Sequence, residues 1–209
     1  LETVINAALK GQREAVSEFA RAVRLAWEGA PRPARTRGFV LLLGPTGTGK
    51  TEMTLITVRQ LFGENGARKN FARFDMAEYQ HRDAIVKLLG GERTKPLLGE
   101  AIDRLNDAGG GILLLDEIEK AEPNLVKVLL SFDAARVTMN DGDTKDLSRI
   151  FIVMTSNLGS AEAASMRSAP FSTLKRHILK AAEDFFSPEV LARFSARIVT
   201  NRLSFEIQR

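Results

Sequence analysis

The feature that most constrains the fold of this chain is a glycine-rich segment between an apolar run and a helical pattern. The segment Gly44–Thr51 reads Gly-Pro-Thr-Gly-Thr-Gly-Lys-Thr and fits the phosphate-loop pattern G-x-x-x-x-G-K-[ST]. The residues before it, Phe39–Leu43, are all apolar, as in a strand buried on both faces. A helical stretch over 50–62 follows. A buried strand that leads through such a loop into a helix is typical of P-loop nucleotide-binding proteins.

The residue types of this loop suit the binding of phosphate groups. Glycines let backbone N–H groups turn inward toward phosphate oxygens, and the helix that follows adds the positive end of its dipole. Lys50 would supply a full positive charge to the β- and γ-phosphates, and the Thr51 hydroxyl can coordinate Mg²⁺. We therefore predict a site for ATP or ADP with Mg²⁺. Its phosphate-binding residues would be Gly44, Pro45, Thr46, Gly47, Thr48, Gly49, Lys50 and Thr51.

A second apolar run ends in two acidic residues and completes the predicted site. Ile112–Leu115 has the pattern of a buried strand and leads directly into Asp116 and Glu117. Because ligands of parallel sheets bind at the carboxyl ends of the strands, Asp116 would lie beside the phosphate loop and hold Mg²⁺ through water. Glu117 would polarise the attacking water as a general base. The pair therefore favours hydrolysis over phosphate transfer to a second substrate.

Strand and helix patterns alternate along the rest of the chain. Further strands are expected at Phe71–Phe74, Ile150–Met154 and, more weakly, Arg197–Thr200, and further helices over roughly 81–90, 97–107, 123–133 and 172–186. This alternation predicts a parallel sheet covered by helices on both faces. We expect an α/β fold, a three-layer P-loop domain with a five-stranded, mostly parallel sheet. Turn residues at Asn140–Asp143 predict a hairpin within Val137–Leu147.

The residues before the first strand predict helices and a connector. Residues 3–27 show helical periodicity with a break at Gly11. Residues 29–37 contain two prolines and no periodicity, which indicates an exposed connector. We therefore expect one domain over 1–209, with helices and connector over 1–37 and the P-loop α/β core over 38–209.

Composition narrows the class of protein further. A chain of 209 residues with 44% hydrophobic and 27% charged residues suits one soluble domain. No apolar run reaches the roughly 18 residues that span a bilayer, and the absence of Cys excludes a disulfide framework. We expect no secretion, because the sequence shows no charged-then-apolar segment ending in a cleavage site. We expect a cytoplasmic protein without membrane contact. The net charge of +4 permits contact with nucleic acid or acidic partners without arguing strongly for either.

Several motifs, in this order and spacing, resemble those of the Clp-type AAA+ ATPases. They are GPTGTGKTE at 44–52, FDMAEY at 74–79, LLDEIEKA at 114–121 and MTSNLGS at 154–160. The resemblance is strongest to the second ATPase ring of the heat-shock disaggregases, the ClpB-like proteins. It extends from Lys10-Gly11-Gln12 to Ser187–Arg193 and so covers nearly the whole chain.

The resemblance implies roles for further residues. Asn157 would be the sensor that hydrogen-bonds the attacking water or the γ-phosphate; without the resemblance it would be a capping residue after a strand. Arg193 would be an arginine finger that reaches the γ-phosphate bound to the next subunit; without the resemblance it would be a solvated surface arginine. Lys10, Gly11 and Gln12 would lie near the adenine. A finger that acts in trans implies a homo-oligomer, in this family a hexameric ring or spiral that couples ATP hydrolysis to remodelling of a protein substrate.

The chain departs from this family in two places. The family's substrate-gripping pore loop carries Gly-Tyr-Val-Gly-Tyr, whereas Leu89–Gly99 contains no aromatic residue and instead offers Arg93 and Lys95. The family also continues past the last core strand into a small helical lid with a second sensor arginine. This sequence ends at Arg209, so we expect the C-terminal helical lid to be absent from it.

Two other functions remain open at this stage. The basic charge, with Arg93 and Lys95, allows a nucleic-acid-associated AAA+ motor, loader or regulator, although the wording of the motifs favours a protein partner. The second alternative function is that of a structural AAA+ subunit that binds ATP and hydrolyses it slowly. The complete set of Lys50, Asp116, Glu117 and Asn157 argues against such slow hydrolysis.

Lys50→Ala is expected to abolish detectable ATP binding, because the substitution removes the only full positive charge of the phosphate loop. Titration calorimetry with ATP measures the effect directly. Wild-type affinity in the variant would contradict the assignment of the phosphate loop.

Overall fold

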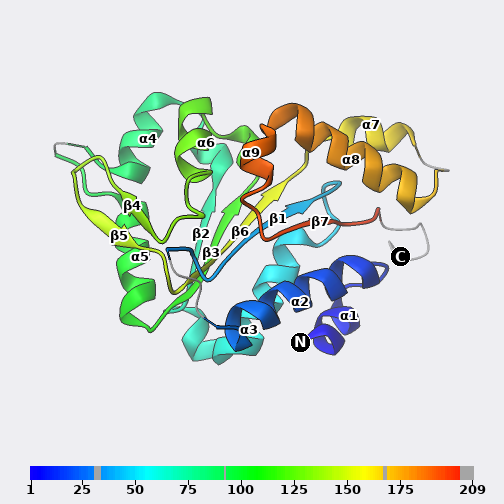
Figure 1. The fold of residues 1–209 in the computed structure, drawn as a ribbon, viewed down its shortest axis with the longest axis horizontal. Coiled ribbons are helices and arrows are strands. Elements are labelled where there is room, and N and C mark those ends of the chain that lie inside the picture. Colours follow the sequence, from blue (N-terminus) through cyan, green and yellow to red (C-terminus); the bar gives the residue numbers. More distant parts are fainter. Residues whose placement is uncertain (31–33, 92, 167–168, 203–209) are drawn as a thin grey trace.

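A parallel sheet forms the centre of the computed structural model, which describes residues 1–30, 34–91, 93–166 and 169–202. Within these residues its five strands run in the order β2-β3-β6-β1-β7 (Figure 1). They are β1 (Gly38–Leu43), β2 (Phe71–Asp75), β3 (Gly111–Asp116), β6 (Ile150–Ser156) and β7 (Ala196–Val199). Every neighbouring pair is parallel, so the sheet is more regular than the expected mostly parallel one.

The central strands are apolar on both faces because helices cover both sides of the sheet. Successive side chains of β1 alternate: Phe39, Leu41 and Leu43 belong to one hydrophobic cluster, and Val40 and Leu42 belong to the other. The first cluster includes side chains of α4 (Arg82–Leu89), α5 (Leu97–Asp107), α6 (Pro123–Leu129) and α8 (Phe171–Phe185), and the second includes side chains of α1 (Glu2–Ala8), α2 (Arg13–Glu28) and α3 (Lys50–Ala67). The expected three-layer α/β architecture is therefore confirmed.

The element boundaries differ from the sequence-based expectations at a few ends. The helix expected over 50–62 continues as α3 to Ala67 across a kink at Gly63, whose φ is 68°. The helix expected over 123–133 ends at Leu129, because the backbone then turns through i→i+3 hydrogen bonds such as Phe132 N to Leu129 O. Two short helices, α7 (Ser160–Ser165) and α9 (Pro188–Leu191), were not expected.

The predicted hairpin is present as β4 (Arg136–Thr138) and β5 (Thr144–Asp146), which pair antiparallel. It lies beside the connection between α4 and α5, because Asn140 donates its backbone N–H to Leu89 O and its side-chain amide to Gly90 O. The break predicted at Gly11 separates α1 from α2. Of the connector expected over 29–37, residues 31–33 lie outside the described part of the chain. Across the described ranges, none of the helices combines the length and the apolar character needed to cross a bilayer.

Candidate functional site

The phosphate loop follows β1 at the carboxyl end of the sheet, and all three of its glycines have a positive φ. Gly44 and Gly49 have φ values of 142° and 91°, which side chains rarely allow. A Cβ on Gly44 would also stand 2.2 Å from Thr200 Oγ1, and one on Gly49 would stand 2.8 Å from a methyl carbon of Leu9. The loop is therefore enclosed by residues from both ends of the chain.

Hydrogen bonds fix the loop against the end of β7. The Thr48 hydroxyl donates to Pro45 O at 2.8 Å and lies 2.6 Å from the Thr200 hydroxyl. Thr200 in turn bonds to Leu43 O through both its hydroxyl and its backbone N–H, at 3.1 and 2.8 Å. Thr200 was expected to end a strand; the strand stops at Val199, and Thr200 instead supports the loop.

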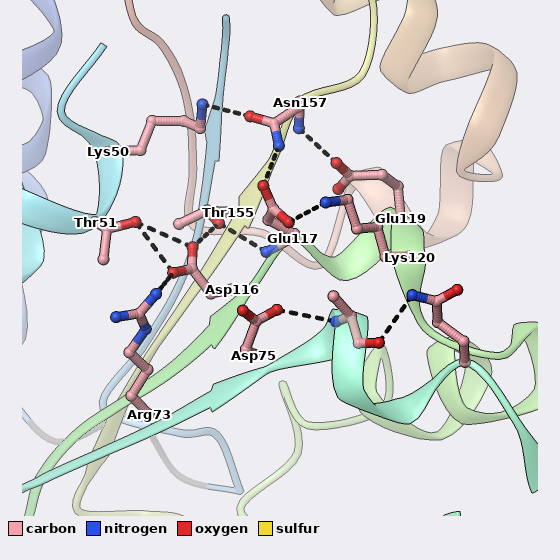
Figure 2. A network of polar contacts seen from close by, with 12 residues as sticks. Lys50, Thr51, Arg73, Asp75, Asp116, Glu117, Glu119, Lys120, Thr155 and Asn157 are labelled. Atoms are coloured by element: carbon pink, nitrogen blue, oxygen red, sulfur yellow. Dashed lines mark hydrogen bonds and ion pairs between the residues drawn. The ribbon is translucent and has the colours of Figure 1, made fainter. Parts of the chain in front are cut away.

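Lys50 begins α3 and is buried among oxygens at the mouth of the sheet. Its Nζ donates to Gly44 O at 2.7 Å and to Pro45 O at 2.9 Å. It also donates to Asn157 Oδ1 at 2.9 Å, as Figure 2 shows. Burial lowers the pKa of Lys50 to about 8, and the negative charges of Glu119, Asp116 and Glu117 oppose that shift. The site thus holds a cation in a partly desolvated position, where an anionic phosphate would interact with it strongly.

Asp116 ends β3 and accepts hydrogen bonds from three side chains. The Thr51 hydroxyl lies 3.1 Å from each carboxylate oxygen, the Thr155 hydroxyl donates to Oδ1, and Arg73 Nη2 lies 2.6 Å from Oδ2. The side chains come from α3, β6 and β2, and Figure 2 shows them converging on the carboxylate.

Thr51 and Asp116 fit a Mg²⁺ site. They place a hydroxyl and a carboxylate, the oxygen ligands that Mg²⁺ prefers, side by side in the cleft. The described residues contain no group of three or more His, Cys, Asp or Glu side chains that could hold a metal. Mg²⁺ is usually bound through one or two carboxylates together with waters and substrate phosphates.

Glu117 has a backbone conformation that is uncommon for a residue other than glycine. Its φ and ψ are 56° and 54°, in the left-handed region, and its N–H donates to the Thr155 hydroxyl at 2.9 Å. The side chain accepts from Lys120 Nζ at 2.5 Å and from Asn157 Nδ2 at 2.7 Å. The bond from Lys120 lowers the pKa of Glu117, as does the bond from Asn157, while partial burial opposes them. Glu117 is therefore a carboxylate at neutral pH, as a general base must be.

Asn157 follows β6 and connects the two halves of the site. Its Oδ1 accepts from Lys50, its Nδ2 donates to Glu117, and its backbone N–H donates to Glu119 at 3.0 Å. The amide therefore lies between the phosphate-binding lysine and the candidate base. This position suits the sensor role that the family resemblance implies, and that role stays a prediction.

These residues line one cleft with a volume of about 520 Å³. Five of its lining residues were not among the predicted site residues: Glu52 and Leu55 of α3, and Arg73, Asp75 and Thr155. Thr155 lies one residue past the expected end of its strand, and Arg73 and Asp75 alternate with apolar residues on β2. The sequence offered one signal for Thr155: it is a polar residue directly after the apolar run that forms β6, the strand beside β3.

The predicted adenine-side residues directly follow a residue that packs against the phosphate loop. Leu9, which follows α1, packs against Gly49. The buried side chain of Gln12 donates to Asn201 O at 2.6 Å and accepts from Asn201 N at 2.8 Å. Gly11 and Gln12 line a pocket of about 230 Å³ with Asn201, and Lys10 is exposed. Contact with adenine remains a prediction for Lys10, Gly11 and Gln12.

Arg193 is not brought to the phosphate loop of its own chain. It lies between α9 and the start of β7, near the amino end of β1, whereas the phosphate loop follows the carboxyl end of β1. Its Nη1 lies 3.5 Å from Asp133 Oδ1, and Arg35 pairs with the same carboxylate. The side chain is 43% exposed, so it is accessible to another molecule. The role of an arginine finger stays a prediction.

The convergence of Lys50, Asp116 and Glu117 at the carboxyl edge of a parallel sheet defines a P-loop nucleotide-binding domain. Comparison with known families narrows this class. Residues 35–197 match the family described as AAA domain (Cdc48 subfamily). The chain therefore belongs to this family of AAA+ ATPase domains.

Individual relatives agree with the Clp-type resemblance. The chain is 35% identical over 212 residues to the chaperone protein ClpB 2 of Thermosynechococcus vestitus, which covers 97% of this chain and 23% of the relative. It is 36% identical over 207 residues to heat shock protein 100 of Trypanosoma brucei brucei, covering 95% and 23%. The chain thus spans about a quarter of the length of these relatives.

Solved structures support the same fold. An S. cerevisiae Hsp104:casein complex in an extended conformation matches with a TM-score of 0.83 and 32% identity over 99% of this chain and 36% of that chain. A closed-state Hsp104 structure with ATPγS and FITC casein matches equally well. The prediction of an AAA+ core similar to those of the Clp and heat-shock ATPases is confirmed.

Thr155→Val is expected to destabilise the domain by about 1–3 kcal/mol, because it leaves the buried Asp116 carboxylate with one donor fewer and Glu117 N without an acceptor. Urea denaturation measures the change. Thr57→Val is the matched control: Thr57 is equally buried, but its hydroxyl bonds only to Met53 O within α3. Equal losses in the two variants would contradict a special role for Thr155.

Proposed function

We propose that this domain binds ATP with Mg²⁺ and hydrolyses it to ADP and phosphate. The observation that carries the proposal is the placement of Glu117. It is ionised, is one residue from the candidate magnesium ligand Asp116, and is joined through Asn157 to Lys50. A general base beside a phosphate-binding lysine and a metal ligand is the arrangement that water attack on a γ-phosphate requires.

The chemistry follows from the positions of these side chains. Glu117 takes a proton from water as the water oxygen forms a bond to the γ-phosphorus, and the bond from that phosphorus to the β–γ bridging oxygen breaks. Lys50 and the loop N–H groups stabilise the negative charge on the phosphates. Bound Mg²⁺ would be held by Thr51 and, through water, by Asp116, and would neutralise further phosphate charge. Asn157 keeps the base and the lysine at a fixed separation.

Two sets of predicted residues complete this proposal. We infer that Lys10, Gly11 and Gln12 lie beside the adenine, which is supported by the packing of Leu9 on the phosphate loop. We also infer that Arg193 acts on the nucleotide of a neighbouring copy in a homo-oligomeric ring or spiral. Its exposure at the opposite end of β1 supports action outside its own chain.

The proposed partner is a protein in the cytoplasm, which the domain would remodel by coupling the change to ATP hydrolysis. The relatives named chaperone protein ClpB 2 and heat shock protein 100, and the Hsp104 structures with casein, support this choice. A nucleic-acid partner is the second candidate, because Arg93 and Lys95 are exposed between α4 and α5 where the family's aromatic residues are missing. Slow hydrolysis in a structural subunit is the third candidate, and turnover measurements decide it.

Glu117→Gln is expected to leave ATP affinity near that of the wild type and to slow hydrolysis by about 10²–10⁴-fold, because the amide cannot accept a proton from water. Phosphate release measures the rate, and calorimetry measures binding. Glu64→Gln, an exposed change on α3 outside the cleft, serves as the control and should hydrolyse ATP normally. Normal turnover in Glu117→Gln would show that another group is the base.

Arg193→Ala is expected to retain ATP binding and lose hydrolysis, because the finger stabilises the negative charge that develops on the neighbour's γ-phosphate. Such fingers raise the rate of hydrolysis by roughly 10³–10⁵-fold. Mixing it with Lys50→Ala should restore part of the activity, since mixed oligomers contain interfaces with an intact loop and an intact finger. ATPase rate is measured against mixing ratio in a chain that includes the flanking regions and whose oligomers are confirmed. An absence of rescue there would assign Arg193 to an ordinary surface role.

A further inference from the structure

Arg73 is a cation placed on the carboxylate that the proposed function assigns to Mg²⁺. It lies on β2, the edge strand of the sheet, and its Nη2 is 2.6 Å from Asp116 Oδ2. Asp116 is buried, with 6% of its side chain exposed, whereas 44% of the Arg73 side chain is exposed and lines the cleft. Figure 2 shows the guanidinium and the Thr51 hydroxyl approaching the same carboxylate.

The carboxylate has little capacity left for another ligand. A carboxylate offers about four acceptor positions. Thr51 is within reach of both oxygens, Thr155 bonds to Oδ1, and Arg73 bonds to Oδ2. A divalent cation beside Thr51 would therefore share Asp116 with a guanidinium, and two cations at one carboxylate repel each other.

The structure also provides a place for a displaced Arg73 side chain. A second hollow of about 310 Å³ is lined by Arg73, Asp75 and Glu78, together with Phe74 and Tyr79. Asp75 lies two residues along β2 from Arg73, on the same face of the strand, and lines both this hollow and the cleft. Two acids thus lie beside the path along which the guanidinium can turn away from Asp116.

We propose that Arg73 competes with Mg²⁺ for Asp116 and acts as a positioning residue that couples metal arrival to its own release. This inference rests on the proposed function. With Mg²⁺ absent, Arg73 neutralises Asp116 and lends positive charge to the phosphates in the cleft. With Mg²⁺ bound, Arg73 would no longer be needed for either task and would turn toward Asp75 and Glu78. Arg73 and Mg²⁺ therefore substitute for each other in nucleotide binding.

The test is the magnesium dependence of ATPγS affinity, measured by calorimetry as the ratio of Kd in EDTA to Kd in Mg²⁺. Arg73→Met should raise this ratio by about tenfold, within the usual range of coupling between two sites, because the variant loses the charge that supports metal-free binding. Arg73→Lys keeps a charge and should return the ratio toward the wild-type value. Arg136→Met is the matched control, since Arg136 is also an exposed strand arginine, on β4, and does not line the cleft.

The outcomes separate the two levels of inference. An unchanged ratio in Arg73→Met, with normal Lys50-dependent binding in Mg²⁺, overturns the competition and leaves the proposed function intact. A lowered ratio also overturns it, because Arg73 would then support the metal site. Failure of the wild type to bind ATPγS in Mg²⁺ would remove the proposed function and this inference together. Cooperative urea unfolding of each variant confirms that the compared proteins are folded.

Discussion

The hydrogen bonds to the buried carboxylate of Asp116 join the segments from which the site is built. A desolvated carboxylate is costly unless donors satisfy its oxygens. Here the donors come from α3, β2 and β6, so the first turn after the phosphate loop and the two strands that flank β3 are all tied to one group. The hydrogen bonds that join these segments at the carboxyl edge therefore also position the side chains of the candidate site.

The phosphate loop depends on the two ends of the chain as well as on its own glycines. Leu9 packs on Gly49, and the hydroxyl of Thr200 holds Thr48 and the end of β1. Gln12 joins these ends directly, because both polar atoms of its side-chain amide bond to the backbone of Asn201. The loop is thus positioned by contacts between residues far apart in sequence.

The sequence predicted most of the fold because its three central strands, β1, β3 and β6, are fully buried and most of its helices are long enough to show periodicity. The helix over 97–107 has the predicted bounds, and the phosphate loop lies where its pattern places it. Helices of four and six residues, α9 and α7, are too short for a periodic pattern to reveal them. Lys50, Asp116, Glu117 and Asn157 were all brought into one site, since each lies at or just beyond the carboxyl end of a strand of the same sheet.

Supporting residues were harder to predict, because their role depends on a neighbour in space. Hydropathy predicts that β6 ends at Met154. Thr155 and Ser156 are nevertheless completely buried, because their hydroxyls have hydrogen-bond partners. The alternating pattern of β2 predicts that Arg73 is simply exposed. Only the pairing of β2 with β3 brings its guanidinium to Asp116. A pattern along the chain identifies a residue's element; the partner strand decides whether its polar group serves the site.

The site combines fixed and releasable contacts, and burial distinguishes them. Thr155 is fully buried and holds both Asp116 and the strained backbone of Glu117, so it has no freedom to move away. Lys120 and Arg73 reach the same two acids from side chains that are 46% and 44% exposed. Water screens exposed ion pairs and reduces their net stabilisation. Water can reach both cations and replace their bonds to the acids, whereas the buried hydroxyl holds the Asp116 carboxylate and the Glu117 backbone in position.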